Sequence, residues 1–410
     1  MTQFPGPILS ACLLALIVVP LTGARAQAPR PVTRIDAIQD ALDHAPRLLL
    51  AGSDTVAASA GVRAARLFPD PIAAVSYSKS VPQYHVGLSI PLDLPWIRGA
   101  RLAAAQSGRT GSQLRLAFAR VAARLDADTA YTAALAAREQ LALSRRNARD
   151  TDSLLRIAIL RRDAGDVSEL DVELARIFAG QQANTAAGDS LSAESALLTL
   201  QAAMGMIGSD ITITLADTLQ RPPLDVVMTH TGNLLPIAAA EADVRTAELA
   251  TQLQRRSRIV QPTLTAGFET GDPGGSELGI LPTVGIALPL PLMNRNRGNV
   301  ALAEAELQRA HATLAAIRVE STGGVGRAQR ALHIILDQLA RDEHLTAAAN
   351  RVSAMSLTAY REGATTLASV LEAQRMARDV RSRYVADLAA AWIARGVLHL
   401  LTETVASSVP

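Results

Sequence analysis

The sequence predicts a mainly α-helical chain with a small β part, built from two copies of one unit. Hydrophobic residues make up 49% of the chain but aromatic residues only 3%, and alanine-rich, aromatic-poor sequences favour long helices. Proline is missing from 96–221 and again from 292–409, so nothing breaks a helix there. Nearly the same line precedes each stretch: "VGLSIPLDLPWIRG" starts at 86 and "VGIALPLPLMNRNRG" at 284. These observations indicate an internal duplication.

The N-terminus has the pattern of an export signal. An apolar run at 8–21 is too short for a comfortable membrane span, and the small residues that follow predict cleavage between Ala26 and Gln27. A lipoprotein-like box ends at Cys12, but it precedes the apolar run instead of following it, which argues against lipidation. Removal of 1–26 would leave no cysteine, and therefore no disulfide or thiol chemistry.

Charge and residue patterns exclude several functions. The formal net charge is +2, and the basic residues, nearly all arginine, alternate with acids instead of forming blocks. We therefore expect no nucleic-acid partner. The seven histidines are scattered without partners at metal-ligand spacing, so we predict no metal site. No catalytic set or phosphate-binding loop is suggested, and we expect neither an enzyme nor a cofactor.

The first repeat, 27–207, begins with a strand-like pair and continues as a helical hairpin. Apolar side chains alternate with small or polar ones over 71–92, which is typical of two strands with one apolar face. The proline-free stretch then predicts a helical hairpin over 98–205, with helices at about 98–163 and 167–205. Gly165 stands between them, where a left-handed backbone would let the chain reverse.

The second repeat, 234–403, has the same plan. It predicts a strand hairpin at 262–291 and a helical hairpin at 297–403, with Gly363 at the reversal. The segment before it includes an alternating stretch at 211–215, which predicts a short strand that ends before two prolines. The remaining parts are an equatorial linker, 208–233, and a C-terminal tail, 404–410.

Two interpretations of the strands stay open from their pattern. The strand hairpins could lie on a soluble core, or they could face lipid on one side and a polar lumen on the other. Four strands cannot close a barrel, and open edges in lipid leave backbone groups unpaired at several kcal/mol each. If the strands span a membrane, several chains must therefore share one wall. The long helices, with modest apolar stripes, also require neighbours.

The helical-hairpin turns resemble those of the TolC-like outer membrane efflux proteins. The resemblance covers about 33–403 and is most specific in "AGDVSELDVELAR" (164–176) and "AYREGATTLASVLEAQR" (359–375). The line "PLPLMNRNRGNVALAEAE" (289–306) is most similar to the heavy-metal and cation efflux subgroup. The resemblance implies a homotrimer in outer membrane lipid. Twelve strands would form a shared transmembrane β-barrel, and twelve helical staves a long α-helical barrel in the periplasm.

The family resemblance also implies a role and a set of site residues. The protein would be a passive exit duct without catalysis, supplied by an inner-membrane efflux pump and a periplasmic adaptor protein. A hydrogen bond between Tyr360 and Asp171 is hypothesised to hold the closed state. Glu372 from three chains would form a cation-attracting ring, whereas Ser369 departs from the family's usual acid. The expected periplasmic gate comprises Asp171, Tyr360, Ser369 and Glu372; the tip turns and adaptor contacts comprise Gly165, Asp166, Gly363, Ala364 and Thr365.

One alternative from another class of protein remains. A soluble periplasmic coiled-coil adaptor or scaffold would share the export signal and the long helical hairpins. It would not need four alternating strands, placed in duplicate before the helices. The exported substrate and the identity of the pump do not follow from the sequence.

Overall fold

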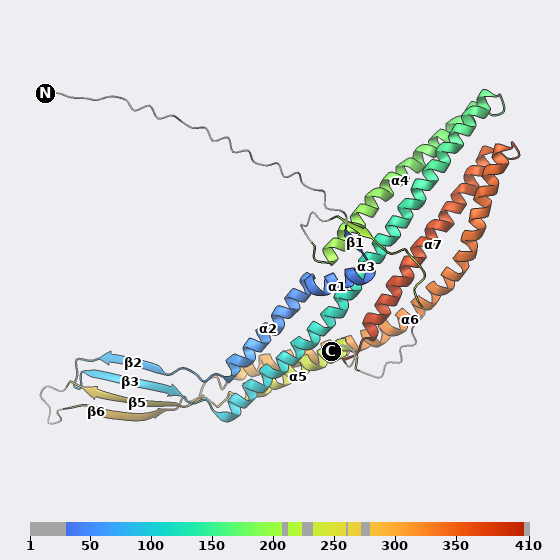
Figure 1. The fold of residues 1–410 in the computed structure, drawn as a ribbon. Coiled ribbons are helices and arrows are strands. Elements are labelled where there is room, and N and C mark those ends of the chain that lie inside the picture. The colour runs from blue at the N-terminus through green and yellow to red at the C-terminus, as the bar shows by residue number, and fades with distance from the viewer. Residues whose placement is uncertain (1–29, 207–211, 224–232, 260, 272–278, 406–410) are drawn as a thin grey trace, which may run out of the picture.

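The computed structural model describes residues 30–206, 212–223, 233–259, 261–271 and 279–405. The predicted signal peptide, its cleavage site at Ala26–Gln27, and Cys12 lie outside the described residues. The described part is mostly helical with a small β part, as predicted. A four-stranded sheet lies at one end of an elongated helical body (Figure 1).

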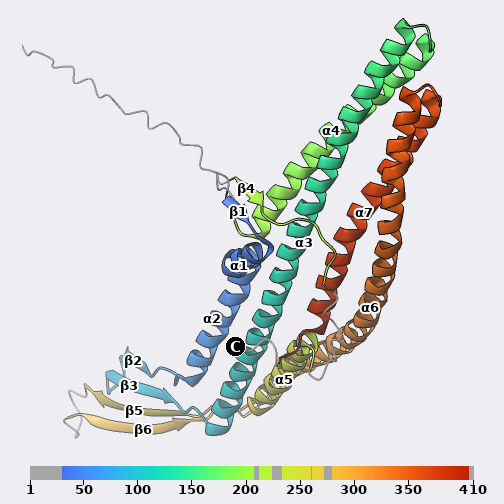
Figure 2. The same cartoon turned by 45° about the vertical axis from the view of Figure 1, so that its right-hand side comes forward.

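Two long helical hairpins form most of the molecule. The first consists of α3 (Pro95–Asp163) and α4 (Glu169–Ala203), and the second of α6 (Arg297–Arg361) and α7 (Leu367–Thr402). Helix α3 has 69 residues, which corresponds to about 100 Å at 1.5 Å per residue. The hairpins run in the same direction, with both turns at the end farthest from the sheet (Figures 1 and 2). Helix α7 packs on both α6 and α3 and so joins the two hairpins.

Three further helices precede the strands, and the sequence analysis did not specify them. They are α1 (Arg34–His44), α2 (Pro46–Arg66) and α5 (Leu235–Arg256). A capping box starts α1, in which Thr33 accepts from the amide of Asp36 and the Asp36 carboxylate accepts from Thr33. Helices α1 and α2 pack against α3, while α5 packs against α3 and α6. Each strand pair therefore follows a short helix and leads into a long helical hairpin.

A small parallel pairing fixes the linker to the middle of the helical body. Strand β1 (Arg30–Val32) pairs with β4 (Ile213–Leu215), which lies within the predicted linker strand; Ile211 lies outside the described residues. The buried Tyr131 hydroxyl lies 2.8 Å from the carboxylate of Asp217 and 3.0 Å from the carbonyl oxygen of Val32. These contacts attach Arg30–Val32 and the linker to α3.

The sheet joins both strand hairpins. Strands β2 (Ile72–Tyr77), β3 (Tyr84–Pro91), β5 (Thr263–Thr270) and β6 (Leu281–Ala287) are ordered β2-β3-β5-β6, and every pairing is antiparallel. The pairing of β3 with β5 brings together segments almost 180 residues apart in the chain. Among the described residues of one chain, β2 and β6 each keep an edge without a strand partner.

The register divides the sheet into an apolar face and a polar face. Because directly paired residues share a face, Val75, Val86 and Phe268 lie on one side in neighbouring strands. Nearly every side chain on that face is apolar or aromatic, and the opposite face is dominated by small and polar residues. The apolar face holds Ala73, Val75, Tyr77, Tyr84, Val86, Leu88, Ile90, Leu264, Ala266, Phe268, Thr270, Pro282, Val284 and Ile286.

Small residues dominate the helix contacts, and many large apolar side chains remain exposed. Buried positions on α3 include Ala123, Ala127 and Ala134, which let neighbouring helices approach closely. Helix α7 contains a window of mean hydropathy 1.3 that is long and apolar enough to cross a bilayer, yet only 22% of that window is buried. Exposed apolar residues also follow one another along α4 and α6: Leu170, Leu174, Ile177, Leu191, Leu198, Val319, Ile334, Leu345, Val352 and Met355.

Candidate functional site

The turns of the two helical hairpins have the same backbone geometry. Gly165 and Gly363 have φ of +84° and +76°, the left-handed region that glycine adopts without strain. In each turn, the amide after the glycine donates to the carbonyl oxygen five residues earlier at 2.8 Å. This hydrogen bond defines a Schellman motif, which ends α3 and α6. The glycines predicted as chain reversals therefore occupy left-handed turns.

The return helices begin with side-chain caps. Ser168 and Asp171 form a capping box at the start of α4, and the Thr366 hydroxyl accepts from the amide of Ser369 at the start of α7. The predicted adaptor-contact residues lie at the outer end of the molecule. Four of them are exposed and Thr365 is half-buried; the exposed ones are Gly165, Asp166, Gly363 and Ala364.

A buried cluster just below the turns connects the two hairpins. Tyr360 is its largest side chain and is only 1% exposed. Arg161 of α3 donates to the carbonyl oxygen of Tyr360 at 3.0 Å, and its guanidinium lies 5.0 Å from the centre of the Tyr360 ring. One arginine thus ties the first turn to the second. Tyr360 is the buried member from α6, and the others come from α3, α4 and α7: Leu154, Ala158, Val172, Ala175, Leu367 and Val370.

The hypothesised hydrogen bond between Tyr360 and Asp171 is absent from this chain. The Tyr360 hydroxyl is buried and makes no hydrogen bond to any described residue. Asp171 instead accepts from the Ser168 hydroxyl at 3.0 Å and from the Ser168 amide at 3.2 Å. Asp171 occupies the third position of α4, where its carboxylate satisfies the helix N-terminus. Burial raises the pKa of Tyr360, with the neighbouring Arg161 acting in the opposite direction.

The other two predicted gate residues lie together on an exposed strip of α7. Ser369 and Glu372 are three residues apart, and both are exposed. Their neighbours Val370 and Ala373 point into the protein and are buried. Among the described residues, no hydrogen bond or ion pair engages the Glu372 carboxylate. A single chain therefore presents this carboxylate to its surroundings.

A carboxyl pair between α6 and α7 was not found from the sequence. Asp342 is only 5% exposed, and one carboxylate oxygen on each of Asp342 and Asp387 lacks a hydrogen-bond partner among the described residues. Burial raises the pKa of Asp387 to about 6, and a hydrogen bond and charge from Asp342 add to the rise; Arg383 and Gln338 act against it. Because the two residues are far apart in the sequence, no local motif announces the pair.

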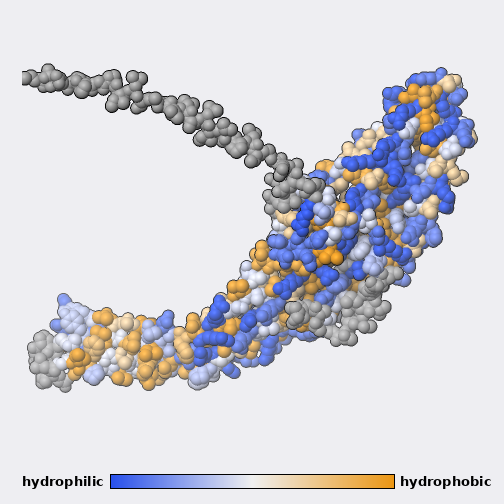
Figure 3. Space-filling model, viewed as in Figure 1, coloured by the Kyte–Doolittle hydropathy of each residue, from blue (hydrophilic) through white to orange (hydrophobic). Residues whose placement is uncertain are grey.

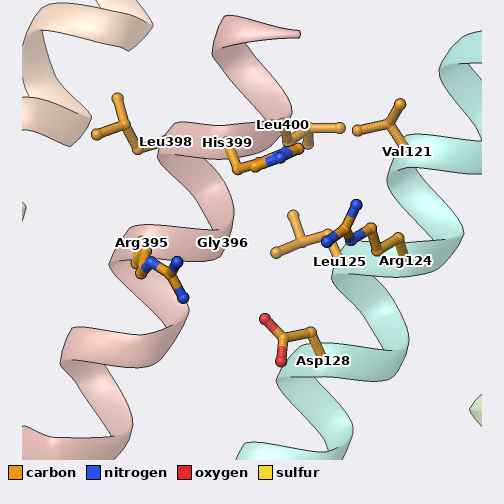
Figure 4. A pocket seen from close by; sticks show the side chains of 9 residues that line it. All are labelled: Val121, Arg124, Leu125, Asp128, Arg395, Gly396, Leu398, His399 and Leu400. Carbon is orange, nitrogen blue, oxygen red and sulfur yellow. The ribbon is translucent and has the colours of Figure 1, made fainter. Parts of the chain in front are cut away.

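A cavity of about 90 Å³ separates α3 from α7 where the hairpins meet (Figure 4). Gly396 permits the close approach, since a Cβ there would lie 2.8 Å from a methyl carbon of Leu125. Burial lowers the pKa of His399, and Arg124 lowers it further, so the imidazole is neutral near pH 7. Asp128 is paired with Arg34, whose guanidinium also lies over a tryptophan ring. The charge of Asp128 is thus neutralised by Arg34, and we assign the cavity no ligand.

The polar face of the sheet carries one histidine–carboxylate pair. His85 on β3 and Glu269 on β5 are direct strand partners, and His85 Nδ1 lies 3.2 Å from Glu269 Oε1. Within the described ranges, no group of three histidine, cysteine, aspartate or glutamate residues is placed to hold a metal ion. The pair is a cross-strand contact of the polar face.

Comparisons with known proteins agree with this architecture. Residues 233–402 match the family model described as outer membrane efflux protein. The chain is 24% identical to the cobalt-zinc-cadmium resistance protein CzcC of Cupriavidus metallidurans over 88% of each chain. It is also 24% identical to the nickel-cobalt-cadmium resistance protein NccC of Alcaligenes xylosoxydans xylosoxydans, over 76% of this chain and 72% of that protein.

The fold is likewise that of solved outer membrane channels. The structure resembles the Campylobacter jejuni CmeC channel with a TM-score of 0.78, at 17% identity, over 90% of this chain and 85% of that one. The family match covers the second hairpin, while the relatives and the fold extend over both. Residues 233–402 thus match the outer membrane efflux protein family, and the described chain has the fold of solved outer membrane channels.

Proposed function

We propose that three copies of this chain form one continuous export duct. The observation that carries this proposal is the sheet: it has one apolar face and two unpaired edges, β2 and β6. Pairing β2 of one copy with β6 of the next closes a barrel and satisfies the edge backbone groups, which lipid cannot do. The alternating faces then place apolar side chains toward lipid and polar ones toward the lumen. The internal duplication supplies two equivalent hairpins per subunit.

The helices support the same assembly. The exposed apolar residues of α4 and α6 lie on the outer helices of the two hairpins, where a neighbouring copy would cover them. Three chains with two long helical hairpins each would enclose a tunnel that continues from the barrel. The turns at the far end, with the exposed Gly165 and Gly363, would meet a periplasmic adaptor. An inner-membrane pump would supply the energy, and this chain would act as the passive duct.

Divalent transition-metal cations are the cargo that we propose. The names of CzcC and NccC associate those relatives with resistance to cobalt, zinc, cadmium and nickel. In a trimer, three Glu372 carboxylates on the exposed strip of α7 would lie near the narrow end of the tunnel. Such a ring attracts cations and repels itself, so cation binding would change the closed state.

The assembly is tested on the full-length protein purified in detergent. Light scattering should give three chains per particle, and planar bilayers should show discrete conductance steps after its addition. A monomer without conductance would refute the duct.

The gate is tested separately with Glu372→Gln. This change should abolish block of the conductance by micromolar Co²⁺ added at the helical end and reduce cation selectivity. The matched control is Glu320→Gln, which removes an exposed carboxylate from α6 and should leave both properties unchanged. Equal Co²⁺ block in the two variants would exclude Glu372 from the gate.

A further inference from the structure

All four junctions between the sheet and the helices place an arginine beside an exposed large apolar side chain. At the α2–β2 junction, Arg66 is followed by Leu67 and Phe68, which are 69% and 64% exposed. At the β3–α3 junction, Trp96 is 46% exposed and Arg98 lies two residues further on. The local sequences at these junctions differ, but the chemistry is the same.

The second pair of junctions repeats this arrangement. Arg258 follows α5 and precedes Ile259, which is 58% exposed. Between β6 and α6, Met293 is 97% exposed, and Arg295 and Arg297 follow it. Exposing apolar side chains of this size to water costs free energy, and their recurrence at one level of the molecule indicates that something covers them there.

Four of these arginines form no ion pair with any carboxylate that the structure describes. We call Arg66, Arg258, Arg295 and Arg297 the junction arginines; all four side chains are exposed, and no ion pair joins any of them to a described residue. In contrast, Arg98 and Arg101 share the buried carboxylate of Asp93. The junctions also hold the carboxylates of Asp70 and Asp93, but arginines outnumber them there, whereas the whole chain has a formal net charge of only +2. In Figure 3, strongly hydrophilic surface begins where the helices meet the sheet and continues along the helical body.

We propose that the junction arginines bind the phosphate groups of anionic phospholipids in the leaflet that faces the helical body. This inference rests on the proposed duct, in which the apolar face of the sheet contacts lipid. Strand β3 has 8 residues and is therefore about 26 Å long, or roughly 20 Å along the membrane normal at the usual tilt of barrel strands, which approaches the height of a barrel's apolar band. Headgroups of one leaflet then lie level with the junctions, and the surface is continuous with the apolar face.

The side chains suit this boundary in two ways. Leu67, Phe68, Ile259 and Met293 are positioned to enter the border between acyl chains and headgroups, as interfacial apolar residues do. A guanidinium directly beside them donates paired hydrogen bonds to a phosphate while its methylene stem stays in the apolar zone. An arginine already lies against one of these apolar side chains, since the Arg98 guanidinium is 4.2 Å from the ring centre of Phe68. A water-filled lumen would explain the arginines but not the apolar partners.

The test compares two fourfold variants of the full-length protein, titrated in detergent with fluorescent phosphatidylglycerol and phosphatidylcholine. One carries Arg66→Gln, Arg258→Gln, Arg295→Gln and Arg297→Gln. The control removes the same charge from exposed, unpaired arginines on the long helices: Arg149→Gln, Arg327→Gln, Arg330→Gln and Arg351→Gln. Each arginine near an anionic surface contributes roughly fivefold to binding. We therefore expect at least tenfold weaker phosphatidylglycerol binding for the junction variant and less than twofold change for the control.

The remaining outcomes decide between lipid and other sources of phosphate. Phosphatidylcholine binding should be equal in all proteins, and 10 mM inorganic phosphate should not displace phosphatidylglycerol. Displacement by inorganic phosphate would show a free-anion site, and equal losses in both variants would show an effect of net charge; either result overturns the proposal. Conductance in phosphatidylcholine bilayers reports the duct separately, and the junction variant should retain it. If the unmodified protein shows no conductance, the duct itself is refuted.

Discussion

Replacement of Asp387 by asparagine should stabilise the protein at neutral pH. The carboxyl of Asp387 faces Asp342 between α6 and α7, and its pKa is raised to about 6 from an ordinary value of 3.8. Because the folded-state pKa lies above the unfolded one, the pair favours folding when protonated. That contribution is present below about pH 4 and is lost as the pH rises through 6.

The size of the effect follows from this rise in pKa. Each pKa unit corresponds to 1.36 kcal/mol, so a rise from 3.8 to about 6 sets an upper limit of about 3 kcal/mol at pH 7.5. Partial exposure of Asp387 reduces this, and we expect the Asp387→Asn protein to gain about 1–2 kcal/mol at pH 7.5. The amide keeps the shape and donates a hydrogen bond to Asp342, which removes the repulsion between the carboxylates.

Thermal unfolding followed by circular dichroism at pH 4.5 and pH 7.5 provides the measurement. The melting temperature of the unmodified protein should fall from pH 4.5 to pH 7.5, and that of Asp387→Asn should fall markedly less. Glu320→Gln is the matched control, since it changes an exposed carboxylate on α6 that forms no ion pair with a described residue, and it should not alter the pH dependence. A lower melting temperature of Asp387→Asn at pH 7.5 would show that the ionised pair is stabilising, and would refute the reasoning.

Three further changes test the packing. Gly267→Ala should sharply reduce assembled protein on unheated gels, because a Cβ there would lie 2.3 Å from the carbonyl oxygen of Val86; Gly87→Ala, with open space around it, should assemble normally. Tyr131→Phe should lower the free energy of unfolding by about 1–2 kcal/mol in urea titrations, because it removes the buried hydroxyl's hydrogen bonds. Arg161→Gln should speed hydrogen exchange at both hairpin turns, since it breaks the contact with the second turn. Faster exchange at the first turn alone would contradict that link.

The elements with strong periodicity were predictable from the sequence. Alternation placed four strands, and the structure has them at Ile72–Tyr77, Tyr84–Pro91, Thr263–Thr270 and Leu281–Ala287. Absence of proline indicated the long helices, and glycine marked their reversals, because each residue type acts on the local backbone. Such effects require no knowledge of distant contacts.

Features that depend on distant contacts were not predictable. The pairing of β3 with β5 and the carboxyl pair of Asp342 and Asp387 arise only when separate segments meet. Within one chain, Asp171 accepts from its local partner Ser168 instead of from Tyr360, and its role at the gate stays a prediction. The helices α1, α2 and α5 were missed because they do not lie in the long proline-free stretches from which the other helices were predicted.

The structural features left unsatisfied in one chain point to a coupling between membrane insertion and assembly. Edge strands β2 and β6 expose backbone donors and acceptors, each costing several kcal/mol in hydrocarbon if unpaired. A typical domain's whole stability is only about 5–15 kcal/mol, so the packing within one chain cannot offset several such losses. A single inserted chain is therefore too unstable to accumulate, and in the proposed trimer the strands enter the membrane only as neighbouring edges pair. In the proposed trimer, the helical hairpins would bring the chains together before that step.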